Sequence, residues 1–169
     1  TEAARALQSL ACRSGERAAA AMSAGALPLL INMVAEGLPE NKTSAASALR
    51  ELANAPGRAE ALVDAGGLLP LAQLLEEGGQ EGRAAAAGAL RNIVAGSSDR
   101  ALATAYSVVP SAVQMLGSDS DEAKDEAAGL LWNLTLGSRE AAVVVFEAGA
   151  LAPLVQLLGS GGPEGRARA

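Results

Sequence analysis

The sequence predicts an all-α solenoid built from repeats of about 41 residues, each with three helices, and two observations lead to this prediction. The segment Ala86–Val94 returns 41 residues later as Ala127–Thr135, and earlier copies begin at Ala45 and Ala3. Half of the residues are hydrophobic but only 2% are aromatic, and alanine and leucine, the strongest helix formers, dominate the apolar content. A fixed period near 40 residues is typical of stacked units and favours function on a surface over function in a pocket.

The repeat is clearest between residues 58 and 97, where glycines separate apolar segments. Leu71, Leu74 and Leu75 have helical spacing. Gly96 follows the longest segment and is placed to close it in a left-handed conformation. The expected elements are a first helix at 58–65, a turn at Gly66–Gly67, a second helix at 68–76 and a third helix at 82–95.

The same pattern extends to the neighbouring repeats. Second helices are expected at 27–35, 68–76, 110–116 and 151–158. Each has a proline at or near its start, where a backbone N–H would have no acceptor within the helix: Pro28, Pro70, Pro110 and Pro153. Third helices are expected at 2–11, 43–53, 82–95 and 121–136.

Two local features of the later repeats give further expectations. Asp119, with Glu122 three residues on, predicts a capping box at the start of the last third helix. Tyr106, Phe146 and the valines at 143–145 fall on first helices, where we expect them to lie in the core.

The domain prediction is one array over residues 1–169. It divides into a third helix of a preceding repeat (1–15), repeats at 16–57, 58–97 and 98–138, and the first two helices of a partial repeat with a tail (139–169). Repeats bury their core against neighbours, so terminal repeats need polar caps. Neither end resembles such a cap, and we therefore expect a part of a longer chain or complex.

Charge and composition exclude several function classes. A net charge of -6 and a pI of about 4.7 argue against binding of nucleic acid or of an anionic membrane. The uncharged stretch 18–35 is broken by Gly25 and Pro28, so membrane insertion is not expected.

The content of reactive residues predicts a protein that is not an enzyme and that holds no metal or cofactor. The chain has no histidine, which removes the commonest general base and metal ligand. No nucleophile and base pair is evident, and the two lysines, Lys42 and Lys124, fall at expected helix starts. A single cysteine excludes an internal disulfide and fits an intracellular location, cytoplasmic or nuclear.

Two sequence patterns resemble those of a known repeat family, and the resemblance covers almost the whole chain. These are Glu147–Leu158, an alanine-glycine turn into a leucine-rich helix, and Ala127–Thr135, with the pattern Ala-Ala-Gly-x-Leu-x-Asn-Leu. They resemble the armadillo repeat family, which implies a right-handed superhelix. HEAT repeats are the alternative family.

The third helices indicate the subtype. Nuclear-import adaptors of the family have a tryptophan four residues before the conserved asparagine, where this chain has Ser47, Gly88 and Gly129. The sequence is more similar to catenin-like and plant or algal armadillo proteins. It departs from the family pattern at Glu51, which replaces the asparagine, and at Ser107, which replaces a turn glycine.

In such an array the third helices line a concave face, and residues three and four apart share one side of a helix. The expected surface strip is Arg5, Gln8, Ser9, Ser47, Arg50, Glu51, Gly88, Arg91, Asn92, Gly129, Trp132 and Asn133. The side chains expected to face the core are Leu49, Leu52, Leu90, Ile93, Leu131 and Leu134.

This strip predicts a peptide groove. Asparagine amides donate and accept hydrogen bonds and can hold an extended partner's backbone. The strip's arginines would favour carboxylates on the partner, and Trp132 would be an aromatic anchor. The predicted binding residues are Arg5, Arg50, Glu51, Arg91, Asn92, Trp132 and Asn133. Alternatively, the asparagines cap or bridge neighbouring helices, the arginines are solvated and Trp132 packs between repeats.

The predicted function is therefore a non-catalytic scaffold that binds a protein or an extended, possibly acidic, peptide. One alternative is an architectural segment of a large assembly, contacted through its edges or convex face. Another is the substrate-recruiting array of a larger protein of the ubiquitin-ligase type.

Overall fold

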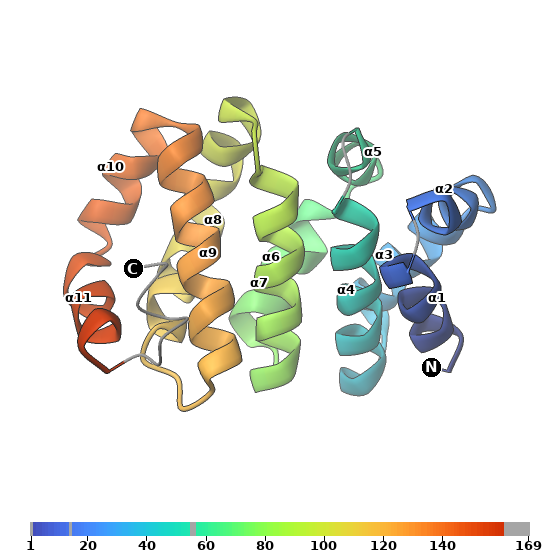
Figure 1. The fold of residues 1–169 in the computed structure, drawn as a ribbon, viewed down its shortest axis with the longest axis horizontal. Helices are drawn as coiled ribbons and strands as arrows, with labels where there is room; N and C mark the ends of the chain where they lie inside the picture. The colour runs from blue at the N-terminus through green and yellow to red at the C-terminus, as the bar shows by residue number, and fades with distance from the viewer. Residues whose placement is uncertain (1, 14, 55–56, 161–169) are drawn as a thin grey trace. The chain divides into compact units, whose positions relative to one another are not determined.

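The computed structural model describes residues 2–13, 15–54 and 57–160 of the 169-residue chain (Figure 1). These described ranges contain eleven α-helices and no strand, and helices account for 85% of the described residues. The chain divides into two compact units, Thr1–Ile93 and Val94–Ala169. The prediction of an all-α protein is confirmed.

The first unit is built from seven helices, and α1 packs beside α4 while α3 packs beside α6 (Figure 1). Its helices are α1 (Glu2–Arg13), α2 (Gly15–Ser23), α3 (Ala26–Glu36), α4 (Pro39–Ala53), α5 (Arg58–Asp64), α6 (Leu68–Glu77) and α7 (Gln80–Val94), the last residue of which falls in the second unit. The predicted third helix at 43–53 therefore begins earlier, at Pro39. A proline is favoured there because the first-turn N–H has no partner within the helix.

Side chains of leucine, isoleucine, valine and alanine fill the core of this unit. Ala45, Ala46 and Ala48 are fully buried on α4, and such small side chains allow helices to approach closely. Leu49, Leu52, Leu90 and Ile93 are at most 2% exposed, as predicted.

The turns between first and second helices depend on glycine. Gly25 has a φ of 82°, and Gly66 has a φ of 81°, in the left-handed region that other residues rarely adopt. Gly96, with a φ of 71°, follows α7 in the same conformation, as predicted.

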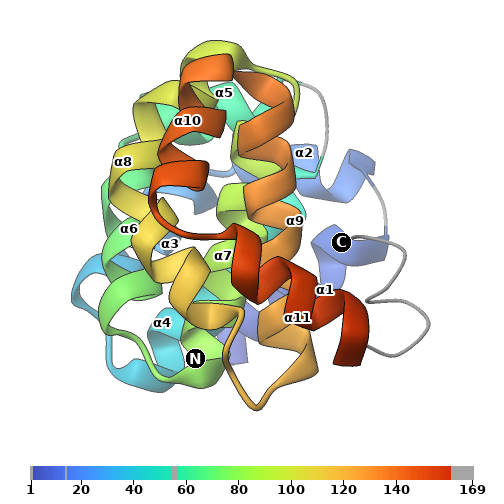
Figure 2. The same ribbon diagram turned by 90° about the vertical axis from the view of Figure 1, so that its left-hand side faces the viewer.

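The second unit contains four further helices, of which α8, α9 and α10 pack against one another (Figure 2). They are α8 (Ser98–Met115), α9 (Asp121–Gly137), α10 (Arg139–Glu147) and α11 (Leu151–Ser160). Leu131 and Leu134 of α9 are buried, as predicted. Pro153 lies in the first turn of α11, the place that the sequence predicts for it.

The prediction of a separate second helix at 110–116 is wrong, because α8 continues without a break through Pro110. Ser107 stands where other repeats have their left-handed glycine, so the chain has no residue suited to the turn. The Ser107 hydroxyl instead donates to the Thr104 carbonyl oxygen at 2.9 Å, within the helix.

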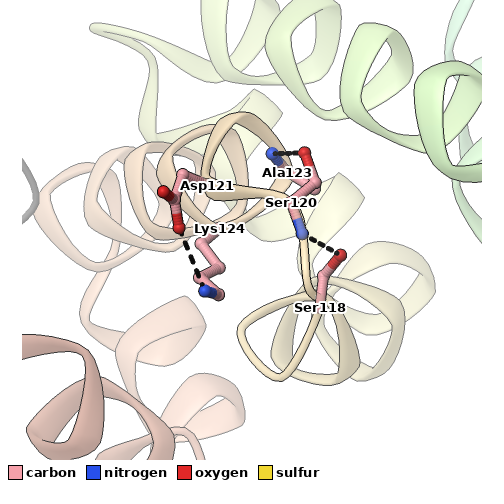
Figure 3. Close-up of polar contacts among 5 residues, drawn as sticks. All are labelled: Ser118, Ser120, Asp121, Ala123 and Lys124. Atoms are coloured by element: carbon pink, nitrogen blue, oxygen red, sulfur yellow. Dashed lines mark hydrogen bonds and ion pairs between the residues drawn. The ribbon is translucent and has the colours of Figure 1, made fainter. Parts of the chain in front are cut away.

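The start of α9 differs from the predicted capping box (Figure 3). Ser120, not Asp119, is the N-cap, and its hydroxyl oxygen accepts a hydrogen bond from the Ala123 N–H at 3.2 Å. The Ser118 hydroxyl oxygen accepts from the Ser120 N–H, also at 3.2 Å. Lys124 pairs with Asp121 at 3.1 Å. The N-cap therefore falls one residue later than the sequence pattern indicates.

The core prediction for three apolar residues on first helices is also wrong. Tyr106 is 73% exposed, Phe146 is 70% exposed and Val143 is 53% exposed, whereas Val145 is buried. Each exposed side chain lies on the side of its helix that no described element covers.

Within the described ranges, no single helix is both long enough and apolar enough to cross a membrane. Two helix pairs reach that length and composition only together, α2 with α3 and α10 with α11, and they are bent by 82° and 80°. The uncharged stretch 18–35 is thus divided between α2 and α3.

Candidate functional site

Within the first unit, a hydrogen bond joins α4 and α7, two of the helices that carry the predicted strip. The Asn92 side-chain amide donates a hydrogen bond to the Arg50 carbonyl oxygen at 3.0 Å. Arg50 lies in the last turn of α4, whose carbonyls have no partners within the helix, and the Asn54 N–H bonds to Glu51 instead. Asn92 therefore caps α4 from the next repeat, which is the bridging role considered as an alternative to ligand binding.

Arg50 and Glu51 are adjacent on α4, and their side chains form an ion pair. The Arg50 Nε lies 3.4 Å from the Glu51 Oε1, and the two side chains are 23% and 19% exposed. Glu51 occupies the position of Asn92 in the preceding repeat, but a carboxylate cannot donate a hydrogen bond to a carbonyl. The replacement thus converts a bridge between helices into a local charge pair.

Arg5 pairs with an acidic residue on its own helix. Its side chain is 65% exposed and its Nη1 is 3.5 Å from the Glu2 Oε1, one turn earlier on α1.

The remaining predicted residues differ in exposure. Arg91 on α7 is partly buried, and so is Asn133 on α9. Trp132 on α9, in the second unit, is 54% exposed, so most of its indole is open to a ligand on that face. Leu136, one turn further along α9, is 77% exposed and enlarges this apolar surface.

A cleft in the first unit was not predicted from the sequence. It has a volume of about 690 Å³ and lies where α3 and α6 end and α4 and α7 begin. Of the predicted strip, Arg5 alone lines it. The acidic residues in the last turns of α3 and α6 were an available signal, because carboxylates are unfavourable at that end of a helix.

Among the described residues, the carboxyl group of Glu140 has a pKa that departs from its ordinary value, and no cluster of side chains suits a metal ion. The pKa of Glu140, in the first turn of α10, is lowered by a backbone hydrogen bond at Glu140 itself and then by the Ser138 hydroxyl. No group of three or more histidine, cysteine, aspartate or glutamate side chains among the described residues could hold a metal ion.

Comparisons with known proteins agree with the repeat pattern. Residues 56–95 match the family described as Armadillo/beta-catenin-like repeat. None of the curated proteins matches the chain.

Three similar solved structures are designed or engineered proteins. A designed armadillo repeat protein in complex with the peptide (KR)4 has 28% identity and a TM-score of 0.89, over 99% of this chain and 71% of that chain. Computationally designed armadillo repeat proteins for modular peptide recognition also have 28% identity and a TM-score of 0.89, over 99% of this chain and 71% of that chain. An engineered protein has 33% identity and a TM-score of 0.91, over 99% of this chain and 68% of that chain.

Proposed function

The chain belongs to the armadillo repeat family, and from this premise we propose that it binds an extended segment of a partner protein along its third-helix face. The fold is that of armadillo repeat solenoids and supports a role as a protein-interaction scaffold. Scaffolds of this family are generally non-catalytic. The similarity to a designed protein in complex with the peptide (KR)4 supports a peptide segment as the ligand here.

The observation that carries this proposal is the position of Asn92. Its hydrogen bond to Arg50 uses one of two amide hydrogens and fixes the orientation of the side chain. The residue is partly exposed, so part of it is accessible to a ligand next to the contact between α4 and α7. An amide held in this way is preorganised to bind the backbone of an extended ligand.

The charge of the strip favours an acidic partner at α4 and α7. Arg50 on α4 and Arg91 on α7 are both partly exposed, and Arg50 lies 3.4 Å from the carboxylate of Glu51. We propose that both arginines attract carboxylates on the partner. Trp132 occupies the corresponding position on α9 and would contact an apolar side chain there.

The subtype, catenin-like or plant or algal, stays a prediction supported by Trp132 and by the small residues Ser47, Gly88 and Gly129.

The test is selection from a displayed library of extended peptides, followed by titration of the best peptide. We expect the selected peptides to be enriched in aspartate and glutamate. Arg91→Glu and Arg50→Glu are each expected to weaken binding by about tenfold or more and to reduce its salt dependence.

The controls separate the groove from the rest of the surface. Arg17→Glu changes an exposed arginine on α2 by the same charge and is expected to leave the affinity unchanged. The double change Trp132→Ala and Asn133→Ala is expected to remove binding while circular dichroism shows the fold retained. Equal affinities for the native protein, Arg91→Glu and the double variant would refute binding on the third-helix face.

A further inference from the structure

The second helices of the first unit end in carboxylates that their own stability does not explain. Glu36 closes α3, and Glu76 and Glu77 close α6, while neither helix has an acidic residue in its first turn or a basic residue in its last. A helix C-terminus carries partial negative charge, so a carboxylate there is unfavourable. Helix stability therefore argues against these residues, and a basic ligand would offset their cost.

Of these carboxylates, that of Glu77 lines the cleft of about 690 Å³. Its apolar lining includes the exposed Pro39, the partly buried Pro70 and the buried Val34 and Leu74. Its rim carries the exposed carboxylates of Glu40, Glu77 and Glu81. The volume falls within the range of about 300–1,000 Å³ typical of ligand sites.

The two cations that line the cleft, Lys42 and Arg5, each have a partner within the first unit. The Lys42 Nζ donates to the Ala35 carbonyl oxygen at 2.9 Å and so caps the end of α3. Arg5 pairs with Glu2 at 3.5 Å on its own helix. The three rim carboxylates therefore outweigh the positive charge available to a ligand.

We propose that this edge cleft docks a lysine- or arginine-rich segment of a partner protein. The aliphatic stems of such side chains suit the accessible apolar lining at Pro39 and Pro70, while their charged ends reach Glu77 and Glu81. The cleft is separate from the strip around Arg91, which favours the opposite charge. The first unit thus presents two surfaces with opposite preferences.

Gly79 provides a way to block the cleft without disturbing the fold. It lines the cleft, and a Cβ added to it would meet no atom within 4 Å. Its φ is outside the left-handed region. A large side chain at this position can therefore extend into the cleft.

The test uses a fluorescein-labelled peptide with lysine at alternate positions, titrated by anisotropy at low and high salt. The double change Glu77→Lys and Glu81→Lys is expected to weaken binding by about tenfold, and Gly79→Trp by a similar factor without a change of charge. The matched control, Glu60→Lys with Asp64→Lys on α5, changes the net charge equally at exposed positions and is expected to alter the affinity by less than about twofold.

The outcomes separate this proposal from the third-helix groove. Arg91→Glu is expected to leave binding of the basic peptide unweakened, whatever it does to an acidic peptide. Equal weakening by the cleft and α5 double variants would show attraction by overall charge and overturn the proposal. Absence of binding to the native protein, or an unaffected Gly79→Trp variant, would overturn it too.

Discussion

Asn92 and Arg50 lie 42 residues apart, and the amide of the first caps the carbonyl of the second at 3.0 Å. The contact links the last turn of one third helix to the next third helix. The contact therefore stabilises the stacking of two successive repeats, and it lies on the surface that we propose for ligand binding.

Asn92→Asp is expected to lower the free energy of unfolding by about 1–2 kcal/mol, because a carboxylate cannot donate to the Arg50 carbonyl and repels it. Urea unfolding followed by circular dichroism measures the change. Asn32→Asp, at an exposed position on α3, is the control and is expected to alter stability by less than about 0.5 kcal/mol. Equal losses in the two variants would mean that the interhelical bond contributes nothing.

Gly66 and Ser107 occupy the same place in successive repeats, and alanine is expected to have opposite effects at the two. Gly66→Ala places a side chain at a φ of 81° and is expected to destabilise by about 1–2 kcal/mol. Ser107→Ala lies inside α8, where alanine has the better helix propensity, and is expected to be neutral or stabilising by a few tenths of a kcal/mol. Thermal unfolding of both variants checks this; a destabilised Ser107→Ala would argue against a continuous α8.

The start of α9 allows the two candidate caps to be compared directly. Ser120→Ala removes the oxygen that accepts from the Ala123 N–H and is expected to cost about 1 kcal/mol. Asp119→Ala is expected to cost less, since Ser120 is the N-cap. Hydrogen exchange at the Ala123 amide is expected to accelerate in Ser120→Ala alone. Acceleration in Asp119→Ala would indicate that Asp119 is the N-cap, as the sequence predicts.

Most of the helices could be predicted because their apolar residues keep one spacing through every repeat. Leu90 and Ile93 are buried because, as their spacing predicts, they lie on the same side of a long helix. The left-handed Gly96 is equally local, because a glycine after a helix suits that conformation whatever surrounds it.

The features that escaped prediction depend on contacts between repeats or on competing local signals. Periodicity places Tyr106 and Phe146 on apolar positions, but their exposure depends on which element covers that side. The hydrogen bond of Asn92 requires the relative height of α4 and α7, which no single repeat specifies. At α9, serine and aspartate are comparable caps, so the sequence alone could not choose between Asp119 and Ser120.

The Glu140 carboxyl provides a pH-dependent test at the start of α10. A hydrogen bond from the backbone at Glu140, and then one from the Ser138 hydroxyl at 2.9 Å, hold its pKa below the ordinary value of 4.5. A lowered pKa in the folded state contributes stability that is present above pH 4.5 and is lost as the pH falls through the folded value. Side-chain NMR titration is expected to place the Glu140 midpoint below 4.5 and to move it upward in Ser138→Ala. The stability advantage of the native protein over Glu140→Gln is expected to shrink on acidification, and an advantage that grew instead would contradict the direction of the pKa shift.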